Sequence, residues 1–161
     1  MSLRNLLLNA AVAALYAAMT LALAPISYGP LQIRLSECMT LLAFFSGKWI
    51  PGLTLGCLIA NLGSPFGMTD MLVGTLATFL AVSFMRFCRN IFLASLCPVI
   101  ANGIFISAEL FYLAEIPANT ISFLLSVLYI DAGEFVAVSL IGPVIFRLLL
   151  KNPLIAFYIK S

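Results

Sequence analysis

Long apolar runs with almost no charge are the feature that most limits what this chain can fold into. Only 9% of its 161 residues are charged, whereas 63% are hydrophobic. A soluble domain carries about 25% charged residues, because its surface must face water. This chain therefore needs lipid as its solvent. Because a spanning helix uses roughly 20 apolar residues, the length predicts an all-α bundle of six transmembrane helices in one domain, residues 1–161.

Proline, glycine and charged residues divide the chain into its expected helices. The predicted helices cover residues 4–24, 34–46, 49–62, 69–88, 91–114 and 129–151, with an apolar hairpin or short helix at 118–128. The second and third are too short to span comfortably alone, so we expect them to tilt or to lean on neighbouring helices. The first resembles a secretory signal peptide, but its apolar run, residues 6–24, has the length of a span. We therefore expect a retained helix.

The distribution of basic residues predicts the orientation of the chain. Lysine and arginine are retained on the cytoplasmic side of a membrane during insertion. With the N-terminus inside, only Arg34 of the eight basic residues falls outside. The seven that fall inside are Arg4, Lys48, Arg86, Arg89, Arg147, Lys151 and Lys160. Both termini are therefore predicted to be cytoplasmic.

The acidic residues follow the opposite pattern. Asp131 and Glu134 precede Arg147 by 16 and 13 residues, which at ~1.5 Å per residue places both in the outer half of the last helix. The other four acids also fall toward the outside, near helix ends. They are Glu37, Asp70, Glu109 and Glu115. All six acids are thus expected in the outer half of the protein.

Several of these groups lie within predicted spans, where an ionisable side chain costs at least ~2.5–3.5 kcal/mol and normally faces the bundle interior. Asp131 and Glu134 are three residues apart and share one helix face. Glu109 and Asn102 lie two turns apart on another helix, and Asn61 ends a third within reach of them. These residues predict an outward-facing polar pocket for a small solute that is rich in hydrogen-bond donors or positive charge.

The remaining charged groups allow two interpretations. Glu37 and Asp70 both open helices, so they are as compatible with the helix dipole as with a binding site. Glu115 is interpreted as a solvated acid at a loop edge. Arg34 lies three residues before Glu37, so it is expected to pair with Glu37, to clamp a ligand together with it, or to hold neighbouring carboxylates together.

A stripe of small residues, Ala10, Ala14 and Ala18, follows one face of the first helix. Residues this small and four apart let another helix approach closely, either from a partner or from within the bundle. Other functions are excluded by what the sequence lacks. It has no histidine and no CxxC pair for a metal site. It has no phosphate-binding GxxxxGK[ST] loop and no HExxH or GxSxG motif, and its net charge of +2 is too small to indicate nucleic acid.

Short motifs recur in a characteristic order over nearly the whole chain: Ile33-Arg34-Leu35-Ser36-Glu37, Pro51-Gly52, Gly56, Ala60-Asn61-Leu62, Asp70, Gly74-Thr75-Leu76-Ala77-Thr78, Pro98, Asn102-Gly103 and Gly133-Glu134. Their order and spacing resemble the queuosine-precursor transporter family, QueT. The resemblance implies a substrate-binding S component of an energy-coupling factor (ECF) transporter in the bacterial plasma membrane. It further implies a transmembrane T subunit and two ATPase subunits as partners, a 7-deazaguanine cargo, and toppling of the S component in the membrane. The alanine stripe is similar to the surface by which S components dock on the T subunit.

The residues themselves agree with that resemblance on two points. A protein with a binding pocket but no energy source needs an energised partner. An acid-rich pocket suits a guanine-like base, whose N1–H and amino group present two donors to one carboxylate. The alternatives are an S component for another vitamin or nucleobase-like solute, an intramembrane enzyme, and a structural membrane subunit with salt-bridged acids.

Overall fold

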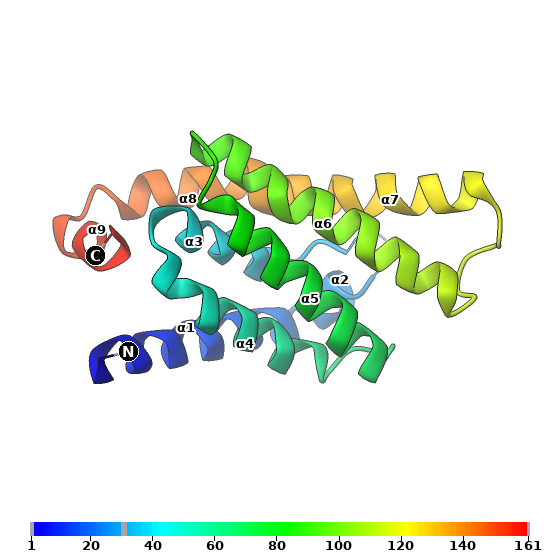
Figure 1. The fold of residues 1–161 in the computed structure, drawn as a ribbon, viewed down its shortest axis with the longest axis horizontal. Coiled ribbons are helices and arrows are strands. Elements are labelled where there is room, and N and C mark those ends of the chain that lie inside the picture. The colour runs from blue at the N-terminus through cyan, green and yellow to red at the C-terminus, as the bar shows by residue number, and fades with distance from the viewer. Residues whose placement is uncertain (1, 30–31, 161) are drawn as a thin grey trace.

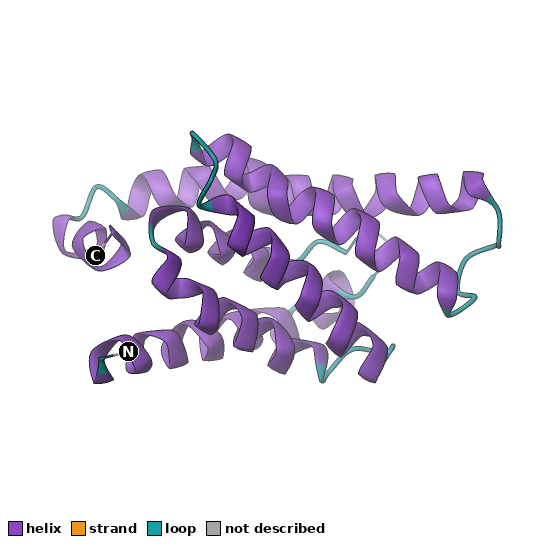
Figure 2. Cartoon of the chain, in the orientation of Figure 1, coloured by secondary structure: helices purple, strands orange, loops and turns teal. Residues whose placement is uncertain are grey.

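The computed structural model describes residues 2–29 and 32–160, and within them every regular element is helical (Figure 2). In chain order these are α1 (Leu3–Ala22), α2 (Ala24–Ser27), the 3₁₀ turns η1 (Leu35–Leu41), α3 (Leu42–Phe45), the 3₁₀ turn η2 (Gly47–Trp49), α4 (Ile50–Asn61), α5 (Met68–Met85), α6 (Ile91–Tyr112), α7 (Thr120–Glu134), the π-helical segment η3 (Phe135–Ile141), α8 (Gly142–Leu149) and α9 (Pro153–Lys160).

The long helices run along the long axis of the molecule, and chain neighbours pack side by side (Figure 1). α4 packs between α1 and α5, and α6 packs between α5 and α7. The short η1 lies inside this arrangement, in contact with α1, α5, α6 and η3. The N-terminus, α9 and the connection from α5 to α6 lie at one end, and the α4–α5 and α6–α7 connections lie at the other (Figure 1).

Among the described residues, four helical runs are long and apolar enough to cross a membrane. They are Leu3–Ala22, Met68–Met85, Ile91–Tyr112 and Thr120–Leu149. The all-α membrane class predicted from the sequence is therefore confirmed. The apolar run Leu35–Phe45 is shorter, and α4 has 12 residues, in agreement with the two short helices that were predicted.

The C-terminal third differs from the prediction. Residues 118–128 were expected to form a hairpin or short helix before a separate helix at 129–151, but the chain is continuously helical from Thr120 to Leu149. Its start is set by Asn119, whose side chain accepts a hydrogen bond from the Ser122 backbone N–H at 2.8 Å. No proline follows before Pro143, so nothing ends the helix at residue 129. The helix α9 was not predicted.

The contact between α1 and α4 is close because two glycines of α4 face α1. The Gly52 N–H donates to the Asn9 side chain at 2.7 Å. A Cβ on Gly56 would lie only 2.8 Å from the Cβ of Tyr16. Tyr16 is completely buried, so this packing fixes its ring in the interior of the bundle.

Candidate functional site

Most of the predicted site residues converge in the interior of the bundle. Seven of them are no more than 3% exposed: Arg34, Glu37, Asn61, Asp70, Asn102, Glu109 and Glu134. They come from η1 and its N-terminal flank, α4, α5, α6 and the end of α7. Asp131 is half-buried. The site is therefore a closed polar core rather than an open cleft.

One part of this core is the arginine group, which consists of Arg34, Asn61 and Asp70. The Arg34 Nη2 donates to Asn61 Oδ1 at 3.1 Å and forms an ion pair with Asp70 Oδ2 at 3.4 Å. The Asn61 amide donates in turn to the backbone carbonyl of Asp70 at 3.1 Å. The pair balances one buried positive charge with one negative charge, and it joins the η1 flank to α4 and α5.

Two neighbours hold the arginine group in place. The Arg34 guanidinium lies 5.3 Å from the ring centre of Tyr28, within cation–π range. The Tyr28 hydroxyl donates to the Ala60 carbonyl at 2.6 Å. On the other side, a Cβ at Gly74 would lie 2.7 Å from Asn61 Nδ2 and 2.9 Å from Asp70 Oδ1. Glycine at 74 therefore leaves the space that these two side chains occupy.

The second part is the glutamate group, which consists of Glu37, Asn102 and Glu134. The Tyr16 hydroxyl donates a short hydrogen bond to Glu37 Oε1, and Thr78 Oγ1 donates to the same oxygen at 3.3 Å. Asn102 Nδ2 donates to Glu134 Oε1 at 2.9 Å and also lies beside Glu37. The π-helical η3 begins directly after Glu134, and such segments are frequent at functional sites.

The glutamate group leaves buried acceptors without a donor. Within the part of the chain that the structure describes, Glu37 Oε2, Glu134 Oε2 and Asn102 Oδ1 have no hydrogen-bond partner. Among residues 2–29 and 32–160, the one ion pair is Arg34–Asp70, so Glu37 and Glu134 have no salt-bridge partner there. An unpaired buried charge is costly. The arrangement is chemically suited to accept hydrogen bonds from a donor-rich or cationic ligand placed between the two carboxylates.

Comparison with known proteins adds an independent observation. The family model described as QueT transporter matches residues 6–151. The chain belongs to the QueT transporter family. It is 45% identical over 84 residues to the queuosine precursor transporter QueT of Lactococcus lactis subsp. cremoris (strain MG1363). That match covers 50% of this chain and 49% of the relative, so the chain spans about half the length of the curated relative that it matches. No solved structure matched the chain.

QueT is described as a transporter family and not as an enzyme family, so the comparisons confirm the expected class and exclude the intramembrane-enzyme alternative. The resemblance stated from the sequence motifs is also confirmed. The structure described for this QueT-family chain shows no cluster of three or more metal-ligating side chains among residues 2–29 and 32–160.

The contacts of Arg34 and Asn61 decide between the arrangements that the sequence left open. Arg34 pairs with a neighbouring carboxylate, Asp70, rather than with Glu37. Asn61 belongs to the arginine group and not to Asn102. Both carboxylate oxygens of Glu109 are buried without a hydrogen-bond partner among residues 2–29 and 32–160.

Asp131 faces α6, as its spacing from Glu134 predicts. Its carboxylate packs directly against the Gly103 backbone, where a Cβ would overlap it. Glu115 is exposed at the α6–α7 connection, where a solvated acid was expected.

Three residues of the polar core were not identified from the sequence: Tyr16, Cys57 and Thr78. Thr78 Oγ1 lies 3.2 Å from Cys57 Sγ, and it donates to Glu37. Tyr16 lies in the alanine-rich first helix, whose small residues indicate close helix packing and not a polar site. The signal that was available is that Tyr16 and Thr20 form a polar pair at a spacing of four within an apolar span.

Proposed function

We propose that this chain is the substrate-binding S component of an ECF-type transporter and that it imports a 7-deazaguanine precursor of queuosine. The family supports the proposal, as does the relative whose name describes it as a queuosine precursor transporter. Because the matched segment covers about half of that relative, the substrate and the partners are inferences for this chain. Residues 1–161 would act as one membrane domain in the bacterial plasma membrane.

The observation that carries the proposal is the pair of buried glutamates with vacant oxygens. A guanine-like base presents its N1–H and exocyclic amino group side by side, and a carboxylate accepts from both. Glu134, held by Asn102, is the acceptor that we assign to this edge. Glu37, held by Tyr16 and Thr78, would then accept a cationic aminomethyl substituent. Hydrogen bonds to charged groups contribute about 1.5–3 kcal/mol each.

The closed geometry indicates that the substrate does not diffuse into a preformed cleft. Arg34, Glu37 and Glu134 are at most 2% exposed, so binding requires helices or connections to move apart. The predicted outer end carries the connections from α4 to α5 and from α6 to α7 (Figure 1). We propose that the ligand enters from that end.

We further propose six crossings with both termini in the cytoplasm. The crossings would be α1, η1 with α3, α4, α5, α6, and α7 continued through η3 and α8. Contacts of the C-terminal helix α9 with Arg4 and Lys48 support this orientation, because all three lie on the side predicted to be cytoplasmic. The Arg4 guanidinium lies 4.7 Å from the ring centre of Tyr158, and Lys48 Nζ donates to the Tyr158 carbonyl at 2.8 Å.

The proposed partners are a transmembrane T subunit and two ATPase subunits, because the chain carries no phosphate-binding loop of its own. The docking surface that we propose is the stripe Ala10, Ala14 and Ala18. All three are exposed, whereas Ala13 and Ala17, which lie beside the stripe on α1, are buried. The stripe is therefore free to receive a helix from outside the chain.

Equilibrium binding of a radiolabelled 7-deazaguanine to the purified protein tests the proposal. We expect saturable binding that excess unlabelled 7-deazaguanine displaces. A 7-deazaadenine, whose ring edge replaces the N1–H donor by an acceptor, is the matched competitor and should displace poorly. Equal displacement by both bases would show that Glu134 does not accept the guanine edge, and an absence of binding would contradict the substrate class.

A further inference from the structure

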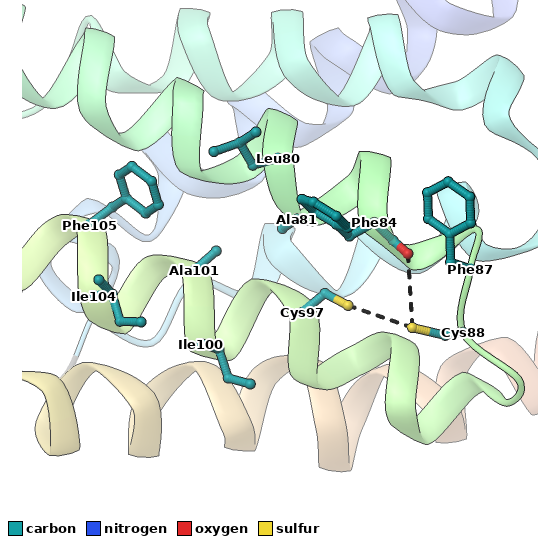
Figure 3. Close-up of a pocket in the computed structure, with 10 residues that line it drawn as sticks. All are labelled: Leu80, Ala81, Phe84, Phe87, Cys88, Cys97, Ile100, Ala101, Ile104 and Phe105. Carbon is teal, nitrogen blue, oxygen red and sulfur yellow. Dashed lines mark hydrogen bonds between the residues drawn. The ribbon is translucent and has the colours of Figure 1, made fainter.

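A groove lies between α5 and α6 (Figure 3). Its volume is about 510 Å³. Side chains of both helices and of the connection between them line it: Leu80, Ala81, Phe84, Phe87, Cys88, Cys97, Ile100, Ala101, Ile104 and Phe105. Phe84, Phe87, Ile100 and Ile104 are each at least half exposed, so the groove opens to the surroundings of the bundle. In a membrane-spanning protein those surroundings are lipid chains.

Two cations stand at one end of this groove. Arg86 and Arg89 are exposed in the connection between α5 and α6. The Arg86 guanidinium lies 4.8 Å from the ring centre of Phe87, which itself lines the groove. Neither arginine has an acidic partner within residues 2–29 and 32–160. An apolar channel that ends at two uncompensated guanidinium groups matches a molecule with an apolar chain and an anionic head.

We propose that this groove binds an anionic phospholipid. One acyl chain would lie along the groove, from Phe84 to Phe105, and the phosphate would lie at Arg86 and Arg89. Arginine suits this head group because its guanidinium forms bidentate hydrogen bonds to phosphate. The connection that carries both arginines lies at the same end as both termini (Figure 1). That end is predicted to be cytoplasmic, and the cytoplasmic leaflet carries the anionic lipids. The lipid would fill the groove between α5 and α6, with its head group beside the connection that joins the two helices.

Native mass spectrometry of the purified full chain, titrated with phosphatidylglycerol or phosphatidylcholine, tests the site. We expect phosphatidylglycerol to be retained in preference to phosphatidylcholine. Arg86→Ala and Arg89→Ala should each weaken phosphatidylglycerol retention about five-fold. The matched control is the double variant Arg147→Ala with Lys151→Ala, which removes two exposed cations at the same end of the molecule but outside the groove. It should leave retention unchanged.

A second variant separates the groove from its charges. Ala101→Phe places an aromatic ring in the groove, which Ala101 faces (Figure 3), and keeps both arginines. We expect it to lower phosphatidylglycerol retention and to leave 7-deazaguanine binding as in the wild type. In the wild type, bound phosphatidylglycerol should also slow maleimide labelling of Cys97, which lines the same groove.

Three outcomes would overturn the proposal. Equal losses in the groove and control variants would show that the positive end attracts lipid diffusely. Unchanged retention in all variants would show that no site exists there. Normal lipid retention by Arg86→Ala together with loss of the co-purifying transporter subunits would show that this face docks a protein instead.

Discussion

The two halves of the polar core differ in how their charges are balanced. In the arginine group, Arg34 and Asp70 neutralise each other at 3.4 Å, and Asn61 bonds to both residues. In the glutamate group, the described residues give Glu37 and Glu134 hydrogen bonds from neutral donors only, and one oxygen of each carboxylate receives none from them. A balanced buried pair holds elements together, whereas unbalanced buried acids need a further partner. We infer that the arginine group is mainly structural and that the glutamate group is mainly for the ligand.

The largest effect that this comparison predicts is on stability. Arg34→Met removes the cation and leaves Asp70 buried without a partner, which is expected to cost about 3–5 kcal/mol of unfolding free energy. Unfolding of the purified protein in detergent measures the loss. The double variant Arg34→Met with Asp70→Leu should recover much of it, because no unpaired charge remains. If Arg34→Met is as stable as the wild type, the Arg34–Asp70 ion pair does not stabilise the fold.

An intermediate effect is expected in the glutamate group, and it should appear in binding rather than in folding. Glu37→Gln removes a negative charge that has no salt-bridge partner within residues 2–29 and 32–160, so the unfolding free energy should not fall. The affinity for an aminomethyl 7-deazaguanine should fall by roughly one to two decades, because a charged acceptor is lost. Ser95→Ala is the matched control, since it deletes a buried hydrogen bond to Ser139 outside both groups. If Glu37→Gln unfolds the protein and Ser95→Ala does not, Glu37 is structural.

The smallest effect on binding is expected on the outer face of α1. Ala14→Trp adds a large side chain to an exposed position, so 7-deazaguanine binding by the purified chain should stay unchanged. Uptake in cells that contain the partner subunits should be lost, because the stripe can no longer approach another helix. Ala13→Trp is the contrasting variant, because Ala13 is 2% exposed and packs against Gly56, and it should destabilise the fold. Normal uptake by Ala14→Trp would remove the stripe from the docking surface.

These regions also show how far the sequence could predict the structure. The apolar runs identified the helices of α1, α4, α5 and α6 within a few residues, because proline, glycine and arginine punctuate them. The boundary near residue 129 was wrong. Residues 118–128 were predicted to form an apolar hairpin or short helix of their own, whereas one helix runs from Thr120 to Leu149 and packs Asp131 against α6.

The composition of the site was more predictable than its pairing. Burial of acids within spans is costly, so Glu109 and Glu134 could be placed in the interior from their positions alone. Which groups meet depends on the three-dimensional packing of helices distant in sequence. Arg34 reaches Asp70 across 36 residues, and Tyr16 reaches Glu37 across 21. Spacing along one helix gives no information on such contacts.

The assignment of Glu134 to the guanine edge is the central claim, and pairing a variant with an analogue tests it most directly. Glu134→Gln keeps the shape of the side chain but replaces one acceptor by a donor, so the affinity for a 7-deazaguanine should fall by roughly one to two decades. An analogue that lacks the exocyclic amino group should bind the wild type weakly and should lose less on the same substitution. The predicted result is therefore that the loss of affinity on Glu134→Gln is larger for the ligand with the amino group than for the analogue without it. Equal losses for both ligands, or unchanged binding of the full ligand by Glu134→Gln, would contradict the account.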